Sequence, residues 1–172
     1  MESCEQAPGL NMLQHGESVH RHYKELIASI ERGERPEFDA LYSMLRLPDA
    51  EVLKAYHIYH DCGKPLCLTI VDGKRQYPNH AAISAEQYLR IFPTEGFAAA
   101  LIKNDMNFHI MKGDDLLKFC KSPFAPILYF TAWAEIAANA EMFGGTQSES
   151  YKIKRSRLIQ SGKKLLNSLK GN

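Results

Sequence analysis

Apolar residues recur at helical intervals along most of this chain. Within residues 11–31, the residues at such intervals are Leu13, Val19, Tyr23, Leu26, Ile27 and Ile30. Comparable patterns predict further helices over residues 37–45, 50–60, 80–91, 96–110, 124–142 and 152–169. The predicted fold class is therefore all-α.

Glycine, proline and short polar residues separate the predicted helices. Pro48 near the start and Asp49 in the first turn favour the helix over 50–60. Residues 66–77 have an extended pattern with a turn at Asp72-Gly73, which allows a small hairpin there. Asn79 is expected to cap the helix that begins at residue 80.

Length and composition favour a folded protein rather than a disordered or membrane-spanning one. The chain has 172 residues, of which 45% are hydrophobic and 24% charged. We expect one domain over residues 1–150, with residues 151–172 as a basic helical segment packed on the same domain. No apolar run approaches the roughly 20 residues that span a bilayer, and residues 1–8 lack the apolar core of a secretory signal.

The cysteines also indicate a compartment. Cys4, Cys62, Cys67 and Cys120 show no CxxC spacing, which favours reduced thiols. We therefore expect a cytoplasmic protein with no membrane partner.

Charge is distributed unevenly along the chain. The net charge is +1, but residues 151–172 contain seven basic residues and no acidic one, so the remainder carries −6. Lys152, Lys154, Arg155 and Arg157 are candidate contacts for phosphate or nucleic acid. The alternative is a solvated terminal helix with lysines on its outer face.

The strongest chemical signal is the sequence His60-Asp61-Cys62-Gly63-Lys64. An adjacent histidine and aspartate offer a metal one imidazole nitrogen and one carboxylate oxygen from a single short segment. This donor mixture suits a divalent ion such as Mn²⁺, Mg²⁺, Fe²⁺, Co²⁺, Ni²⁺ or Zn²⁺ better than a structural thiolate site would. A His-Asp pair is common, so its surroundings decide its meaning.

Those surroundings resemble the HD-domain superfamily of metal-dependent phosphohydrolases. The resemblance lies in the order of His15, His60-Asp61 with Gly63-Lys64, His80 and then His109, and it covers residues 11–143. The segment Gln14-His15-Gly16-Glu17-Ser18-Val19 is similar to the family's first-histidine helix. The resemblance implies an HD-domain-like helical bundle.

The resemblance implies that His15, His60 and Asp61 are metal ligands. The family's last ligand is normally an aspartate on a long C-terminal helix, where this chain has Glu135. Glu135 is the only charged residue between Ser122 and Ala140, and a buried carboxylate is costly unless a cation or strong donors satisfy it. The alternative is a buried salt bridge or an exposed face of this helix.

His80, Asp105 and His109 are candidates for a second metal or for binding phosphate. His80 and His109 resemble additional histidines of some superfamily members, and Asp105 stands about where such members carry a histidine. Asp105 lies four residues before His109, hence on the same predicted helix face. The alternatives are a one-metal site with both histidines on the substrate, or structural histidines. Lys64 is expected to contact a phosphate oxygen, unless it is simply exposed.

The function that these residues predict is hydrolysis of a nucleotide or of a terminal phosphate of nucleic acid. Asp61, Lys64, His80 and His109 would be catalytic, acting on a metal-activated water and on the developing charge. One alternative is a non-catalytic HD-fold module that binds a nucleotide or RNA, motivated by Glu135 and Asp105. Another is a helical interaction protein with coincidental histidines.

Overall fold

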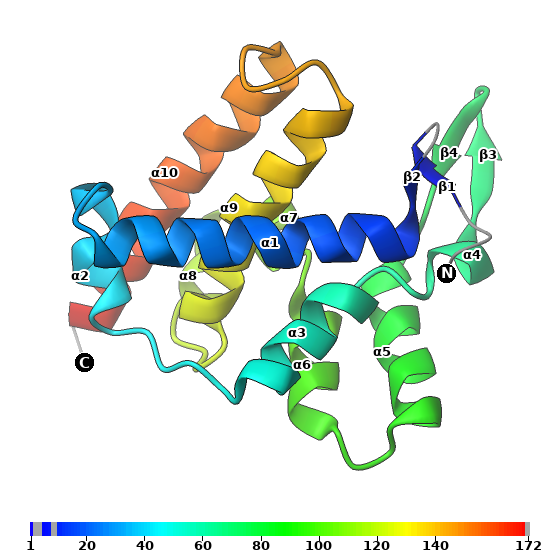
Figure 1. Cartoon of the computed structure of the whole chain (residues 1–172), viewed down its shortest axis with the longest axis horizontal. Coiled ribbons are helices and arrows are strands. Elements are labelled where there is room, and N and C mark those ends of the chain that lie inside the picture. The colour runs from blue at the N-terminus through cyan, green and yellow to red at the C-terminus, as the bar shows by residue number, and fades with distance from the viewer. Residues whose placement is uncertain (2–4, 8–9, 171–172) are drawn as a thin grey trace. The chain divides into compact units, whose positions relative to one another are not determined.

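The fold is mainly helical, as the sequence predicts. The computed structural model describes residues 1, 5–7 and 10–170, and the side chains of residues 1 and 11–170 (Figure 1). The longer helices are α1 (Met12–Glu31), α3 (Ala50–Tyr59), α5 (His80–Ile91), α6 (Gly96–Asn104), α9 (Ala125–Met142) and α10 (Glu149–Lys170). The short ones are η1 (Pro36–Phe38), α2 (Asp39–Tyr42), α4 (Lys64–Cys67), α7 (Asn107–Ile110) and α8 (Gly113–Phe119).

The small hairpin near residues 66–77 is confirmed. Strands β3 (Thr69–Val71) and β4 (Lys74–Gln76) pair antiparallel, with Val71 opposite Lys74. Asp72 and Gly73 between them have φ angles of 50° and 71°, the left-handed conformation that a tight two-residue turn requires. A second pair, β1 (Glu5–Ala7) with β2 (Leu10–Asn11), is also antiparallel.

Several details of the predicted helices are wrong. The helix predicted over 96–110 is broken after Asn104, whose side-chain amide donates to the Ala100 carbonyl at 2.8 Å. Short polar side chains of this kind favour helix ends, because they bond to nearby backbone groups. The helix predicted over 37–45 ends at Tyr42, and α8 had no predicted counterpart.

The predicted roles of two capping residues also change. Asp49 is the N-cap of α3 rather than a first-turn residue, since its carboxylate accepts from the Glu51 N–H at 2.8 Å. Asn79 precedes α5 as predicted, but it has φ 57° and makes no side-chain cap bond.

The contacts within the chain define two compact units, which we describe separately; that residues 1–150 form one domain stays a prediction. The first unit comprises Met1–Ser18 and Pro48–Met106. In it, α6 packs against both α3 and α5, and α4 packs against α5. The rings of Tyr59, Tyr88 and Phe92 lie 5.0–5.6 Å apart between centroids and form part of this core.

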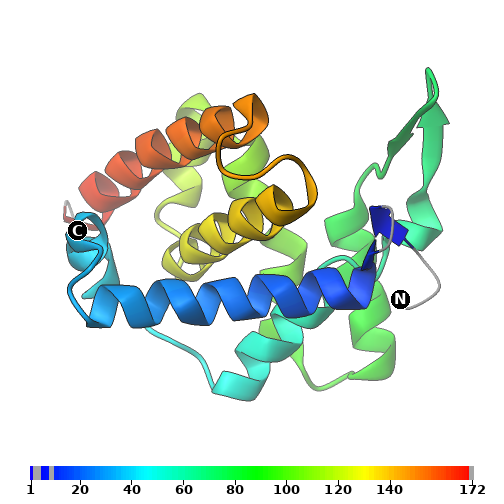
Figure 2. The same ribbon diagram turned by 45° about the horizontal axis from the view of Figure 1, so that its top comes forward.

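The second unit comprises Val19–Leu47 and Asn107–Asn172. Its centre is α9, which is buried around most of its circumference and runs beside α10 (Figures 1 and 2). Tyr129 and Trp133 of α9 form an aromatic cluster with Phe38. Gly162 of α10 lies against the Tyr129 ring, since a Cβ there would be 2.7 Å from the ring carbon Cζ.

Two further sequence predictions can be compared with the structure. Cys62, Cys67 and Cys120 are free thiols, whereas Cys4 lies outside the described residues. Among the helices of the described chain, none combines the length and apolar character needed to cross a membrane.

Candidate metal centre

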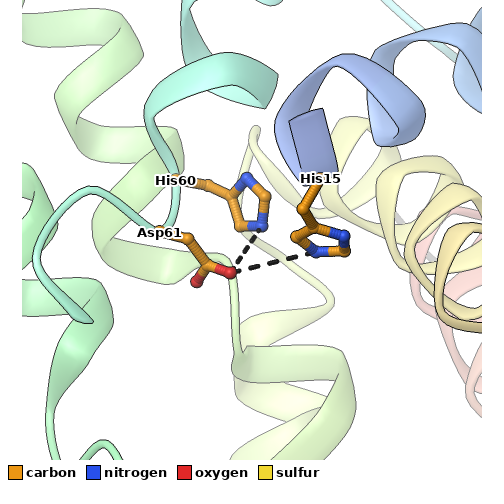
Figure 3. Close-up of side chains that lie close together, drawn as sticks. All are labelled: His15, His60 and Asp61. Atoms are coloured by element: carbon orange, nitrogen blue, oxygen red, sulfur yellow. Dashed lines mark ion pairs between the residues drawn. The ribbon is translucent and has the colours of Figure 1, made fainter. Parts of the chain in front are cut away.

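The first unit brings His15, His60 and Asp61 together. His15 is in the first turn of α1, His60 is the residue at which α3 ends, and Asp61 follows in the adjoining turn. Figure 3 shows the two imidazole rings turned toward one carboxylate oxygen of Asp61. All three residues are at most 2% exposed. Two segments 45 residues apart in sequence thus supply one buried cluster.

The distances in this cluster fit a shared metal ion. Oδ2 of Asp61 lies 3.4 Å from Nε2 of His60 and 3.8 Å from Nε2 of His15. One ligand atom from each of the three residues lies within 4.8 Å of the other two. The rings of His15 and His60 are 5.4 Å apart between centroids and inclined by 57°, so the two imidazoles do not stack face to face.

Gly16 allows α1 to approach the end of α3. A Cβ atom at position 16 would lie 2.7 Å from the carbonyl oxygens of both His57 and Ile58. Only glycine therefore permits this backbone separation, and His15 owes its place beside His60 to the residue that follows it. A glycine inside a helix costs about 1 kcal/mol in propensity relative to alanine, which the close packing here must offset.

Backbone carbonyls fix the orientation of two histidine rings. Nδ1 of His60 lies 2.8 Å from the His57 carbonyl oxygen, and Nδ1 of His80 lies 2.9 Å from the Tyr77 carbonyl oxygen. Because a carbonyl oxygen only accepts, each Nδ1 carries a proton, and in the neutral ring Nε2 keeps the lone pair that a metal would bind. His57 contributes its backbone carbonyl to this arrangement.

His80 faces the other oxygen of Asp61. Its Nε2 lies 3.6 Å from Oδ1, while His15 and His60 face Oδ2. His80 is the first residue of α5, as the sequence predicts. The Oδ2 atom of Asp61 therefore faces His15 and His60, whereas its Oδ1 atom faces His80.

Lys64 is buried and paired with the same carboxylate. Its Nζ donates to Oδ2 of Asp61 at 2.5 Å and lies 5.4 Å from the centre of the Tyr77 ring. Burial of a lysine next to a carboxylate requires this kind of pairing, because an unpaired buried charge is costly. The prediction that Lys64 was simply exposed is thus excluded, while its contact with phosphate stays a prediction.

Gly63 positions the turn that carries Asp61 and Lys64. Its N–H donates to Oγ of Ser84 in α5 at 2.8 Å, and a Cβ at position 63 would lie 2.5 Å from the Ser84 nitrogen. The glycine therefore serves close packing on α5. Burial raises the pKa of the neighbouring Cys62 thiol, which donates to the Ser84 carbonyl at 3.4 Å.

Asp105 lies close to the centre, and its role in a second metal site or in phosphate binding stays a prediction. It is 4% exposed, accepts a hydrogen bond from the Tyr56 hydroxyl, and has a carboxylate oxygen within 4.8 Å of a ring nitrogen of His60. The prediction that Asp105 and His109 share one helix face is wrong. The helix ends between them, and Asp105 belongs to the first unit whereas His109 belongs to the second.

Glu135 is buried as the sequence indicates. It lies in α9 of the second unit, is 9% exposed, and accepts a bond from the Asn139 amide at 3.3 Å. The alternative of an exposed face is therefore excluded for Glu135. Its role as a metal ligand, and that of His109 on substrate, stay predictions.

The four basic candidates of α10 do not share one face. At 100° per residue, Lys152, Lys154, Arg155 and Arg157 point in directions spread around the helix. Lys152 pairs with Glu149 at 3.2 Å, and Arg155 lines two cavities of the second unit. These four positions therefore do not form a continuous basic strip for nucleic acid.

The donor set fits a divalent cation. Two imidazole nitrogens and one carboxylate oxygen form the mixed nitrogen and oxygen set that Mn²⁺, Fe²⁺, Co²⁺, Ni²⁺ or Zn²⁺ accept, and Asp105 adds a nearby oxygen. The supporting residues Gly16, Tyr56, Tyr77 and Ser84 were not identified from the sequence as part of the site. Only Gly16 gave a signal, as a glycine inside a helical pattern directly after a candidate ligand.

Comparisons of the chain with descriptions of known protein families, with curated proteins and with solved structures found no match.

Proposed function

We propose that this protein is a metal-dependent phosphohydrolase related to the HD-domain superfamily, acting in the cytoplasm on a nucleotide or on a terminal phosphate of nucleic acid. The observation that carries the proposal is the buried group of His15, His60 and Asp61. It is joined by the order of histidines that resembles the superfamily and by the free thiols of the described chain.

His15, His60 and Asp61 would hold the ion, with Asp105 or Glu135 as a further ligand. When bound, the ion would supply a water of lowered pKa and a positive charge next to the phosphoryl oxygens. The bonds from His60 and His80 to backbone carbonyls keep both Nε2 atoms turned toward Asp61. Rings that are preorganised in this way need no rearrangement when the metal ion binds.

Asp61 would orient the attacking water and accept its proton, since it is the carboxylate on which the cluster converges. His80 would donate a proton to the leaving oxygen. Lys64, 2.5 Å from Asp61, would move to a phosphate oxygen and stabilise the charge that develops there. His109 is proposed as a further substrate contact.

The test is phosphate release in the presence of Mn²⁺, Mg²⁺, Co²⁺, Ni²⁺, Fe²⁺ or Zn²⁺. Substrates are mononucleotides, nucleoside triphosphates, cyclic nucleotides and oligonucleotides with a 5′ or 3′ phosphate. We expect turnover by the natural protein, a loss of at least about 100-fold in Asp61→Asn, and no loss in Asp115→Asn, an exposed aspartate of the second unit. The salt dependence of activity distinguishes the two substrate classes. Activity on nucleic acid that is held by many cations should fall steeply with salt concentration, whereas activity on a mononucleotide should not.

One observation favours a second function. Lys64 pairs with Asp61 and balances its charge, as a module that binds nucleotides or RNA without catalysis would need. Equilibrium binding of Mn²⁺ and of labelled nucleotides distinguishes the two. Nucleotide binding without turnover for any substrate and metal would replace the enzyme with this module, whereas turnover lost in Asp61→Asn excludes the module.

A further inference from the structure

The second unit contains a cavity that the proposed metal chemistry does not use. It has a volume of about 400 Å³ and lies among η1, α2, α9 and α10. Its apolar and aromatic lining residues include Phe38, Leu41, Tyr129, Trp133, Ile159 and Leu166. Its size is within the range of about 300–1,000 Å³ that is typical of small-molecule sites.

A more polar cavity of about 290 Å³ adjoins it. Both cavities are lined by Trp133 and Arg155, so these two residues stand where the apolar space meets the polar one. Trp133 is 7% exposed, whereas Arg155 is exposed. A ligand in the apolar cavity would thus contact an indole at its body and a guanidinium at its end.

The charges around the apolar cavity favour an anion. Arg155 and Lys163 both line it, and neither makes an ion pair among the described residues. The carboxylate of Glu37 also lines it, but that group is engaged by Arg35 at 2.7 Å. The surplus is therefore two cations at the edge of an apolar space.

The second carboxylate nearby is also engaged. Glu25 lines the polar cavity rather than the apolar one, and it pairs with Arg21 at 3.5 Å and with Nδ1 of His22 at 3.3 Å. Glu37 also attracts Arg155, but its carboxylate is shared with Arg35, so the three cations Arg35, Arg155 and Lys163 outnumber this one carboxylate. A cationic ligand would meet Arg155 and Lys163 with like charge, and a neutral apolar ligand would leave the surplus positive charge uncompensated.

We propose that this cavity binds a small amphipathic anion, a carboxylate or a phosphate monoester with an aliphatic or aromatic body. The body lies against Trp133, Phe38 and Ile159, and the anionic head pairs with Arg155, with Lys163 adding charge at the edge. Arginine suits both head groups, since its planar fork of donors matches carboxylate and phosphate oxygens. The site belongs to the second unit and does not depend on the proposed phosphohydrolase activity.

The chain offers a direct readout, because Trp133 is its only tryptophan. The intrinsic fluorescence of the full chain, with a chelator present to remove metal, is recorded during titration with octanoate and with octyl phosphate. Octan-1-ol tests the apolar body alone, and inorganic phosphate tests the head alone. We expect a saturable change in the emission of Trp133 with one or both amphiphiles, and binding by octan-1-ol and phosphate at least tenfold weaker.

Three variants locate the binding. Arg155→Gln is expected to weaken binding of the amphiphile about tenfold or more, since charge-assisted hydrogen bonds have that order of effect. Ile159→Phe fills part of the cavity and is expected to weaken binding of octan-1-ol and of the amphiphiles together. Arg157→Gln removes an equally exposed cation from the same helix, one that does not line the cavity, and should leave affinity unchanged.

The preferred head group follows from whether octanoate or octyl phosphate binds more tightly. Absence of a saturable response to both would overturn the proposal, as would octan-1-ol binding as tightly as octanoate. Equal weakening by Arg155→Gln and Arg157→Gln would do the same, because it would reduce the effect to the net charge of α10.

Discussion

Replacement of Gly16 with alanine tests whether close packing of α1 on α3 builds the metal centre. The added Cβ would lie 2.7 Å from two backbone oxygens and 2.8 Å from the Ile58 Cα, none of which can turn away as a flexible side chain would. An ordinary contact of 3.4 Å requires the two backbones to separate by about 0.7 Å. That movement carries His15, the preceding residue, away from His60 and Asp61.

The magnitude follows from two opposing effects. Alanine is the better helix former by about 1 kcal/mol, which favours the variant. Overpacking against rigid neighbours costs about 1–3 kcal/mol. The upper part of this range applies here, because the added Cβ would clash with two carbonyl oxygens. We therefore expect Gly16→Ala to lower the free energy of unfolding by about 2 kcal/mol. We also expect a 10–100-fold loss of metal affinity, as displacement of a supporting group produces in metal sites.

The assay pairs this variant with Gly96→Ala. Gly96 begins α6, and a Cβ there would meet nothing within 4 Å, so the control should gain about 0.4–1 kcal/mol through the unfolded state. Stability is measured by urea denaturation of metal-free protein, and affinity by the visible absorption of added Co²⁺. If Gly16→Ala proved as stable as Gly96→Ala and bound Co²⁺ like the natural protein, the argument from close packing would be refuted.

Three further predictions concern buried groups. Asp61→Asn removes the carboxylate that pairs with the buried Lys64 and should lower the free energy of unfolding of metal-free protein by about 3 kcal/mol, measured by urea denaturation. Adding Lys64→Met to this variant should recover much of the lost stability. If the effects of the two single substitutions simply added, this coupling would be contradicted. Gly162→Ala places a Cβ 2.7 Å from Cζ of Tyr129 and should lower the unfolding free energy by about 1–3 kcal/mol, whereas an unchanged melting temperature would show that the ring can move. Burial raises the pKa of Tyr129 to about 12, so the unfolded chain loses this proton first, near pH 10; stability from this group is present below pH 10 and declines by roughly 2–3 kcal/mol toward pH 12. Urea titrations of wild type and Tyr129→Phe at pH 9 and 11 should show a smaller decline in the variant, and equal declines would exclude Tyr129 as the cause.

The sequence by itself determined the helical fold class and the main candidate ligands. The apolar spacing in residues 11–31 and 124–142 is local information, and the helices found there begin and end within one residue of the predictions. The turn at Asp72-Gly73 was equally local, because its left-handed conformation depends on the residue types themselves. His60-Asp61 could be identified as a candidate metal-binding pair because adjacent residues carry both donors.

Only the tertiary structure decided which distant groups meet. The apolar period of residues 96–110 continues through the break after Asn104, so periodicity alone could not show where the helix after Gly96 ends. The partner of Asp105 depended on how α3 and α6 pack, and the need for glycine at position 16 depended on how α1 approaches the end of α3. The basic residues of α10 could be counted from the sequence. The cavity that Arg155 lines exists only because α10 packs against α9 beside η1 and α2. Period and residue type are properties of a short segment, whereas burial and partnership arise from segments far apart in the chain.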